Sequence, residues 1–343
     1  MSPGKVRSGN LLMGIWTMNN HVVSFSGGRT SAFMVWLFEQ RKKVEDINVE
    51  YIFCDTGAEH PKTYEFINNV VNHFGIDLTC IRADISLEKG IGSTYRVVPL
   101  SECKHDLVPF RATMMKHSTP TLINCHCTDR MKSTPSDKYC NDKYGRRNFT
   151  KWLGMRIDEP GRINNVKNQL EMFEIETKKK APVNLDYLGN ISDCTKQDVL
   201  DFWSKMPFDL EIPEWLGNCM FCIKKTPQKV ALAARQEPEH AAKFIELIND
   251  PEIRVKMVNV QTGSYYQNSD DLEPIPIYET RELPNDIMYR QSQSLVSIVA
   301  AYADISEEDL IDNITFGKKL DTGSCSESCE ATFSMDFGDD DND

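Results

Sequence analysis

One stretch, Val22–Met34 (VVSFSGGRTSAFM), constrains the fold more than any other part of the chain. Its apolar beginning predicts a strand, and the apolar periodicity after the two glycines predicts a helix. Adjacent glycines let a backbone approach an anion with its N–H groups turned inward, and the helix adds its positive N-terminal end. The stretch therefore predicts a phosphate-binding loop of consecutive residues: Ser26, Gly27, Gly28, Arg29, Thr30 and Ser31.

The side chains of this loop suit the same ligand, because the hydroxyl groups donate hydrogen bonds and Arg29 offers a planar fork for phosphate oxygens. The loop has neither the Walker A spacing nor the G-x-G-x-x-G pattern. It resembles the SGG-x-[TD]-S loop of the PP-loop family, whose members bind ATP or adenylylated sulfate. The alternative interpretation is a plain Gly-Gly turn between two core elements.

The following segments predict an α/β fold with a doubly wound, mostly parallel sheet. Asn48–Cys54 is typical of a buried strand, Pro61–Phe74 of a helix that begins at a proline, and Asp77–Ala83 of a third strand. Ligands of such sheets bind at the carboxyl ends of the strands, which brings Asp55–Glu59 beside the phosphate loop. Either terminal acid of that segment is then a candidate for binding a ribose hydroxyl or a magnesium ion. Alternatively, the acids only cap the helix.

A later strand-like run, Lys151–Ile157, adds to the predicted site. Gly154 permits close approach of a ligand. Arg156 and Arg162 carry forks that suit phosphate or sulfate, and the acidic residues between them are alternative partners.

Composition limits the class of protein. A net charge of −12 argues against a broad phosphate-neutralising surface and leaves nucleic-acid binding undecided. No stretch has the length and apolar character to span a membrane, and no convincing secretory signal is present. Eleven cysteines, with no secretory signal, are more often metal ligands or redox groups than disulfides. We therefore expect a cytoplasmic protein.

The chain is expected to divide into a loose leader (1–19), a nucleotide-binding α/β domain (20–190), a helical cysteine-bearing region (191–330) and a disordered acidic tail (331–343). A variant capping box at Thr195 opens one helix of the third region, and residues 229–249 and 286–303 also have helical periodicity. The segment 90–116 shows little periodicity.

Cysteine spacing predicts a metal or cluster site. Cys219 and Cys222 form a C-x-x-C pair followed by lysines, and Cys125 and Cys127 are the nearest candidates for a second half-site. Four thiolates suit an iron–sulfur cluster or a zinc ion. Further cysteines are alternative ligands: Cys140, Cys325 and Cys329. The last two are also a candidate redox pair that attacks a bound substrate. Unconnected thiols are the plain alternative.

Together the motifs VSFSGGRTSAF, YIFCDTGAEHPKTYEF, CTDRMK, WLGMRIDEPGR and GNCMFCIKK resemble the phosphoadenosine phosphosulfate (PAPS) reductase-like proteins of bacteriophages and bacteria. The resemblance implies a PP-loop α/β fold, an adenine nucleotide on the phosphate loop, and sulfur-related chemistry. It also implies a nucleotide pocket shaped by Asp55, Thr56 and Gly57 and closed by Gly154 and Arg156.

The chain departs from this family in one respect, because it lacks the Glu-Cys-Gly-[Leu/Ile]-His motif with which assimilatory PAPS reductases end. Three hypotheses follow. In the first, Cys325 or Cys329 attacks the sulfur of an adenylylated sulfate, Arg29 and Arg156 stabilise the leaving phosphate, and a thiol donor supplies electrons. In the second, an ATP pyrophosphatase uses Mg²⁺ in sulfur transfer, as in the similar DNA phosphorothioation proteins. In the third, the chain is a non-catalytic nucleotide-binding module.

Overall fold

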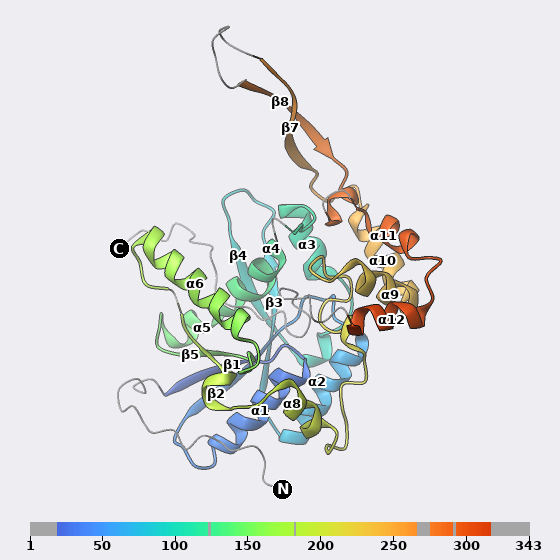
Figure 1. Cartoon of the computed structure of the whole chain (residues 1–343). Helices are drawn as coiled ribbons and strands as arrows, with labels where there is room; N and C mark the ends of the chain where they lie inside the picture. Colours follow the sequence, from blue (N-terminus) through green and yellow to red (C-terminus); the bar gives the residue numbers. More distant parts are fainter. Residues whose placement is uncertain (1–18, 123–124, 182, 266–274, 291–292, 317–343) are drawn as a thin grey trace.

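The computed structural model describes residues 19–122, 125–181, 183–265, 275–290 and 293–316. Its centre is a six-stranded sheet of order β4-β3-β2-β1-β5-β6 (Figure 1). Neighbouring strands are parallel except β3 and β4, which are antiparallel. The strands are β1 Asn20–Ser24, β2 Asn48–Cys54, β3 Leu78–Ile85, β4 Ser93–Val98, β5 Thr150–Leu153 and β6 Asn184–Tyr187. The predicted α/β class with a doubly wound, mostly parallel sheet is confirmed.

Helices cover both faces of the sheet and form a further group in the C-terminal part of the described chain. The α-helices are α1 Arg29–Arg41, α2 Pro61–Phe74, α3 Val108–His117, α4 His126–Thr128, α5 Thr134–Tyr144, α6 Pro160–Thr177, α7 Leu188–Ile191, α8 Lys196–Trp203, α9 Pro227–Gln236, α10 Pro238–Ile248, α11 Leu295–Ala301 and α12 Glu307–Phe316. Short 3₁₀ turns lie at Leu100–Glu102, Glu214–Leu216 and Ile287–Arg290, and a π-helical turn at Asp129–Ser133. Helix α9 contacts α10, α11 and α12.

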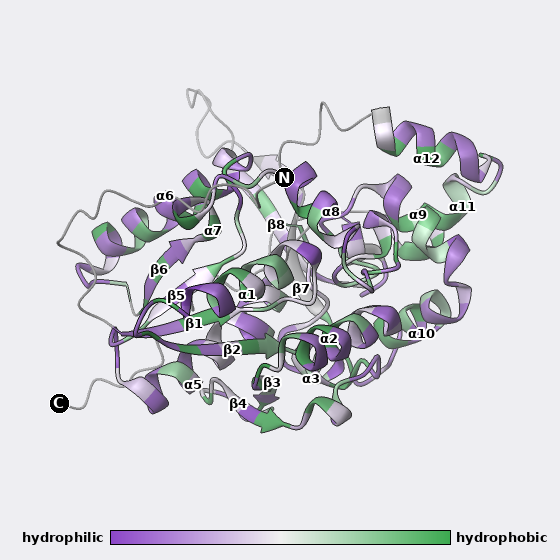
Figure 2. Ribbon diagram, turned by 90° about the horizontal axis from the view of Figure 1, so that it is seen from below, coloured by the Kyte–Doolittle hydropathy of each residue, from purple (hydrophilic) through white to green (hydrophobic). Residues whose placement is uncertain are grey.

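Side chains alternate between the two faces of the central strands, so both faces are apolar and need cover. Tyr51 and Phe53 of β2 belong to the main core, whereas Ile52 between them belongs to a second cluster with Phe149 and Phe173. The helices match this arrangement, because α2 and α10 carry both hydrophobic and hydrophilic residues along their length (Figure 2).

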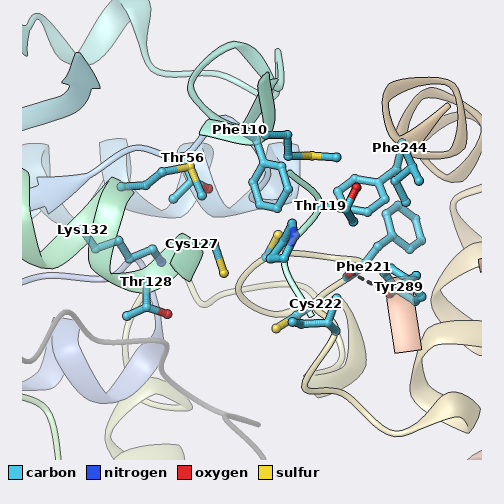
Figure 3. A pocket seen from close by; sticks show the side chains of 16 residues that line it. Thr56, Phe110, Thr119, Cys127, Thr128, Lys132, Phe221, Cys222, Phe244 and Tyr289 are labelled. Carbon is cyan, nitrogen blue, oxygen red and sulfur yellow. Dashed lines mark hydrogen bonds between the residues drawn. The ribbon is translucent and has the colours of Figure 1, made fainter. Parts of the chain in front are cut away.

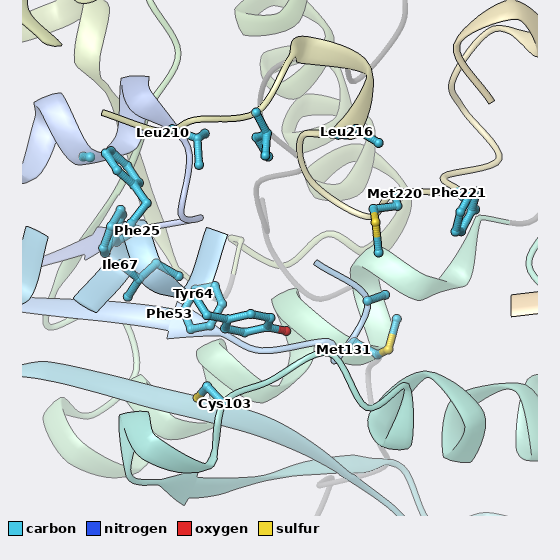
Figure 4. Packing of buried hydrophobic residues seen from close by; sticks show 14 of the residues in the cluster. Phe25, Phe53, Tyr64, Ile67, Cys103, Met131, Leu210, Leu216, Met220 and Phe221 are labelled. Atoms are coloured by element: carbon cyan, nitrogen blue, oxygen red, sulfur yellow. The ribbon is translucent and has the colours of Figure 1, made fainter. Parts of the chain in front are cut away.

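The main core runs from the phosphate loop to the C-x-x-C segment. Phe25, directly after β1, and Ile67 of α2 belong to the same buried cluster as Met220 and Phe221 (Figure 4). The two predicted functional segments therefore rest on one continuous core, and packing fixes their relative position.

Several elements differ from the sequence-based expectation. The segment 90–116 contains β4 and α3, and the run Asn124–Asn141 contains α4, the π-helical turn and most of α5. The predicted helix 229–249 is two helices, because Pro238 cannot continue the hydrogen-bond ladder of α9. The predicted capping box is confirmed at α8, where Thr195 and Asp198 bond each other's backbone N–H.

A two-stranded ribbon, β7 (Lys256–Tyr265) and β8 (Ile275–Leu283), projects away from the rest of the structure (Figure 1). None of the helices in the described ranges has the length and apolar character needed to cross a membrane. The predicted leader, apart from Asn19, and the predicted acidic tail lie outside the described residues.

Candidate functional site

The phosphate loop joins β1 to α1, as the sequence predicts. Gly28 is the N-cap of α1, and Ser31 in the first turn holds the loop together. The Ser31 hydroxyl accepts a hydrogen bond from the backbone N–H of Ser26 (3.2 Å) and donates one to the carbonyl of Gly28 (3.0 Å). The loop therefore presents the positive end of α1 on a fixed backbone.

Gly27 is the position in this loop that requires glycine. Its φ is +81°, and a Cβ atom there would lie 2.7 Å from Cγ2 of Thr63 and 3.0 Å from Cδ1 of Ile67. A larger residue would meet both a strained backbone and the side chains of α2. The sequence GG thus reflects close packing of the loop against α2.

A cavity of about 290 Å³ opens over this loop, and we call it the loop cavity. Its lining contains both polar and apolar side chains. Its lining consists of Ser26, Gly27, Gly28, Arg29, Thr30, Thr63, Arg156, Lys196, Val199, Leu200, Leu210, Ile212, Pro213, Glu214, Gly217 and Asn218. The volume is close to that of a small-molecule site.

Three residues near helix starts line the loop cavity. Thr30 lies in the first turn of α1, Thr63 in that of α2 and Lys196 at the start of α8. First-turn N–H groups lack intrahelical partners and carry the positive end of the helix dipole. At α2 and α8 such groups already have acceptors, because the Lys62 N–H donates to His60 Nδ1 (3.1 Å) and the Lys196 N–H donates to Asp158 (3.0 Å). The start of α1 is therefore the helix end that favours an anionic ligand in this cavity.

The cationic side chains of this cavity already have carboxylate partners. Arg29 donates to both carboxylate oxygens of Asp209 (2.7 and 3.0 Å), so its fork fastens the 207–216 segment to the loop. Arg156 is buried and donates to Asp158 (2.9 Å) and to the Thr30 hydroxyl (3.0 Å). Arg156 thus both lines the cavity and pairs with a neighbouring acid, as the two interpretations of the sequence anticipated.

Other predicted residues lie elsewhere. Asp55 is fully buried and accepts hydrogen bonds from Arg82 (2.7 Å) and Tyr64 (2.8 Å). Burial and the nearby Glu59 raise the pKa of the Asp55 carboxyl, against the effect of Arg82. Gly57 (φ +71°) packs against the segment that begins α3, since a Cβ there would lie 2.6 Å from Asp106 Oδ1.

Gly154 is buried directly after β5, two residues before Arg156. Arg162 donates to Glu159 (2.5 Å).

Three of the four cysteines predicted as ligands, Cys127, Cys219 and Cys222, line a second, smaller cavity of about 30 Å³, which we call the thiol cavity (Figure 3). Its lining consists of Thr56, Phe110, Met114, Thr119, Pro120, Cys127, Thr128, Met131, Lys132, Cys219, Phe221, Cys222, Ile223, Phe244, Ile248 and Tyr289. The Sγ atom of Cys125 lies 3.5 Å from that of Cys127. The fold thus brings together cysteines that are about 90 residues apart in the chain and that their spacing had singled out as candidate ligands.

One turn separates the two cavities. Gly217 and Asn218 line the loop cavity, whereas Cys219 and Cys222 line the thiol cavity. The turn is fixed from several sides, because Met220 N–H donates to the Ala58 carbonyl (3.3 Å) and the Lys225 ammonium donates to the carbonyls of Trp215 (2.6 Å) and Met220 (3.0 Å).

Burial governs protonation around the thiols. It raises the pKa of the Cys219 thiol well above its ordinary value, with Cys222 and Glu59 adding to the effect. Burial also lowers the pKa of Lys225 to about 8. The Cys219 thiol is therefore protonated at neutral pH in this structure.

The alternative ligands are not near this cavity or lie outside the described residues. Cys140 is fully buried in the core cluster on the other face of the sheet. Cys325 and Cys329 lie outside the described residues. Within the described ranges, no group of three or more His, Cys, Asp or Glu side chains is arranged to hold a metal ion. Three of the predicted thiols share one cavity and Cys125 lies beside Cys127, but among the described residues their arrangement is not that of a formed metal site.

Sequence reasoning missed Thr63 and Lys196. Thr63 is 3% exposed and lines the loop cavity, and its hydroxyl has no hydrogen-bond partner. The H-P-K-T segment carried no signal beyond a helix start, because only tertiary packing brings α2 onto the loop.

Comparisons with known proteins agree with the fold and the loop. Residues 20–202 match the family described as "Phosphoadenosine phosphosulfate reductase domain". Over 324 residues the chain is 39% identical to the uncharacterized nin region protein ORF290 of Escherichia phage lambda, covering 93% of this chain and 98% of that protein. No solved structure matches the chain.

Two enzymes match more briefly. A phosphoadenosine 5'-phosphosulfate reductase of Alteromonas mediterranea is 35% identical over 75 residues, 21% of this chain and 29% of the enzyme. An adenosine 5'-phosphosulfate reductase of Pseudomonas aeruginosa is 35% identical over 82 residues, 22% of this chain and 28% of the enzyme. The fold and loop define an α/β protein of the PP-loop type. The chain belongs to the phosphoadenosine phosphosulfate reductase domain family.

Proposed function

We propose that the loop cavity binds an adenine nucleotide, with the phosphate or sulfate end on Ser26–Thr30 and the base against the apolar wall formed by α8 and residues 210–213. One observation carries this proposal. The glycine loop and the start of α1 line a single cavity of suitable volume together with apolar side chains of α8 and residues 210–213. Family membership and the short matches to two sulfonucleotide reductases support the same ligand class.

The reaction proposed is thiol-dependent reduction of an adenylylated sulfate. The thiolate of Cys325 or Cys329 attacks the sulfur, the bond from sulfur to the bridging oxygen breaks, and the nucleotide leaves with that electron pair. Arg156 and the loop N–H groups stabilise the leaving phosphate, and Arg29 holds the adjoining wall. A thiol donor then attacks the S-sulfonated cysteine and releases sulfite, which leaves a mixed disulfide; a second thiol reduces that disulfide.

The thiol cavity supports a role in sulfur chemistry beside the nucleotide. Cys125, Cys127, Cys219 and Cys222 stay the predicted ligands of an iron–sulfur cluster or a zinc ion. The shared cavity supports this assignment, whereas the absence of a formed metal site among the described residues counts against it. Iron, zinc and acid-labile sulfide analysis of protein purified without air tests it. A metal-free protein that retains activity would rule out a required metal.

Activity is tested by incubating the full chain with adenosine 5'-phosphosulfate or PAPS plus a dithiol, and separately with ATP and Mg²⁺. Sulfite release with formation of the matching nucleotide supports the reductase. Pyrophosphate release from ATP supports the ATP pyrophosphatase instead. A protein that binds adenylates but releases neither product is a binding module, and the reductase proposal is then wrong.

A further inference from the structure

The ribbon of β7 and β8 has an outer edge that no strand in the described part of the chain covers. Within that part β8 pairs with β7 alone, and the ribbon projects away from the body of the protein (Figure 1). A two-stranded ribbon is at best marginally stable alone in water, so a further strand on its edge would stabilise it. The side chains of β8 are accessible to such a strand, because Ile277 is 44% exposed and Tyr278 is 57% exposed.

The sequence of β8 is close to a mirror image of itself about Thr280. Residues 276–284 read PIYETRELP, with a proline at each end and an aliphatic residue next to each proline. Glu279 and Arg281 flank the centre, and their side chains are both 59% exposed. Two copies of this segment are therefore complementary to each other when they run antiparallel about a two-fold axis.

The backbone of β8 allows this pairing. Pro276 lies opposite Ser264 of β7 and has no N–H to give to that strand, and prolines in strands turn this side to a free edge. Backbone groups of successive residues point to alternate sides of a strand, so those of Tyr278 and Thr280 point to the outer edge together with that of Pro276. Thr280 is thus placed to form a hydrogen-bonded pair with Thr280 of the partner subunit.

We propose that the outer edge of β8 is a dimerisation surface whose partner is a second copy of this chain, paired antiparallel about Thr280. In this register Glu279 lies opposite Arg281 of the partner subunit, and Arg281 lies opposite the partner subunit's Glu279. Opposite charges directly across an antiparallel pair stabilise it, and like charges destabilise it. The two ribbons then form one continuous sheet, which supplies the further strands that each ribbon lacks.

The prolines at both ends of the segment confine the contact to one partner and one register, because neither can extend the ladder of hydrogen bonds. The symmetry of the sequence also favours a second copy over a strand of another protein, because only a second copy repeats the same order of charges.

Sedimentation equilibrium of the full chain without ligand tests the dimer. Edge pairing buries a small area, so we expect a weak dimer that forms as the concentration rises from about 1 to 200 µM. Wild-type protein that stays monomeric over this range would overturn the proposal.

Reversing either charge tests the register. Glu279→Arg and Arg281→Glu each place like charges opposite each other at both symmetric contacts, so each variant alone should dimerise about tenfold more weakly at low salt. An equimolar mixture of the two variants should regain wild-type affinity within about threefold, because every contact of the mixed dimer again joins opposite charges. Effects within one chain cannot produce this recovery.

Glu65→Arg is the matched control, because it reverses the charge of an exposed glutamate on α2, away from the ribbon (Figure 1). It should leave the dissociation constant of the dimer unchanged. Single variants in β8 that dimerise like the wild type would place the contact at another surface. A mixture that dimerises no better than either variant alone would exclude the register about Thr280. Either result overturns the proposal, and neither bears on nucleotide binding.

Discussion

The loop cavity and the thiol cavity lie on either side of the Gly217–Cys222 turn, yet they are built in different ways. The lining of the loop cavity includes five consecutive residues of one glycine-rich stretch, Ser26–Thr30, and residues near the starts of α1, α2 and α8. The thiol cavity is small and mostly apolar, and its three cysteines come from two distant segments. Local backbone geometry therefore defines the first site, whereas the core defines the second.

This difference predicts that substitutions in the thiol cavity leave nucleotide binding in the loop cavity unchanged. If Cys219 and Cys222 are metal or cluster ligands, replacing both by serine should reduce sulfite release at least a hundredfold, because serine is a poor replacement for a thiolate ligand. AMP affinity should stay within twofold, since the loop-cavity lining is intact. Sulfite assays and calorimetry measure the two effects, and Cys140→Ala serves as a cysteine control outside the cavity. Full activity of the serine variant would remove the thiol cavity from the mechanism.

Gly27→Ala probes the other side of the comparison. The positive φ and the 2.7 Å approach of Thr63 should distort the loop and lower AMP affinity by about ten- to a hundredfold. Calorimetry measures the effect. Gly161→Ala is the control, because a Cβ at Gly161 meets open space in the first turn of α6. Unchanged affinity in Gly27→Ala would mean that the loop does not bind the ligand.

The strand beneath the loop should respond to pH. His21 of β1 is buried and accepts a hydrogen bond from Trp152 Nε1 (2.9 Å), and burial lowers its pKa from 6.5 to about 4. The folded state resists protonation, so stability is fully present above pH 6.5 and falls as the pH drops from 6.5 to 4. The free energy of unfolding should fall by roughly 2–3 kcal/mol more in the wild type than in His21→Gln. Denaturant titrations at pH 7 and pH 4 measure this difference. An equal loss of unfolding free energy in the wild type and in His21→Gln between these two pH values would contradict it.

Arg156→Lys should weaken the nucleotide site about tenfold, because lysine cannot reproduce the fork that joins Thr30 and Asp158. Binding isotherms of AMP measure the loss. Arg162→Lys is the control, because Arg162 pairs with Glu159 and does not line the loop cavity. Similar losses in both variants would indicate a general effect on the start of α6.

The smallest effect is expected from Asp209→Asn. The pair of Arg29 and Asp209 is partly exposed, so its loss should cost less than about 1 kcal/mol of stability. Removing a carboxylate near the anionic end should raise AMP affinity two- to threefold at low salt. Weaker binding would show that Asp209 positions Arg29 for the ligand.

The structure places the predicted loop residues and the predicted acid Asp55 differently. Ser26–Thr30 line the loop cavity as expected, because the glycine turn and helix start depend on neighbouring residues alone. Asp55 was expected at the ligand and instead pairs with Arg82 inside the core. That pairing depends on the register of β3 beside β2, which no local pattern reveals.

The sequence by itself determined the mostly parallel sheet, the glycine turn after β1 and most of the cysteines that line the thiol cavity, because each depends on local periodicity or on chemistry that residue types carry. Only the tertiary structure decided that α2 packs Thr63 against Gly27, that Asp209 accepts hydrogen bonds from Arg29, and that one turn lies between the two cavities. These features join residues separated by tens to hundreds of positions, and side-chain packing in the core sets their distances.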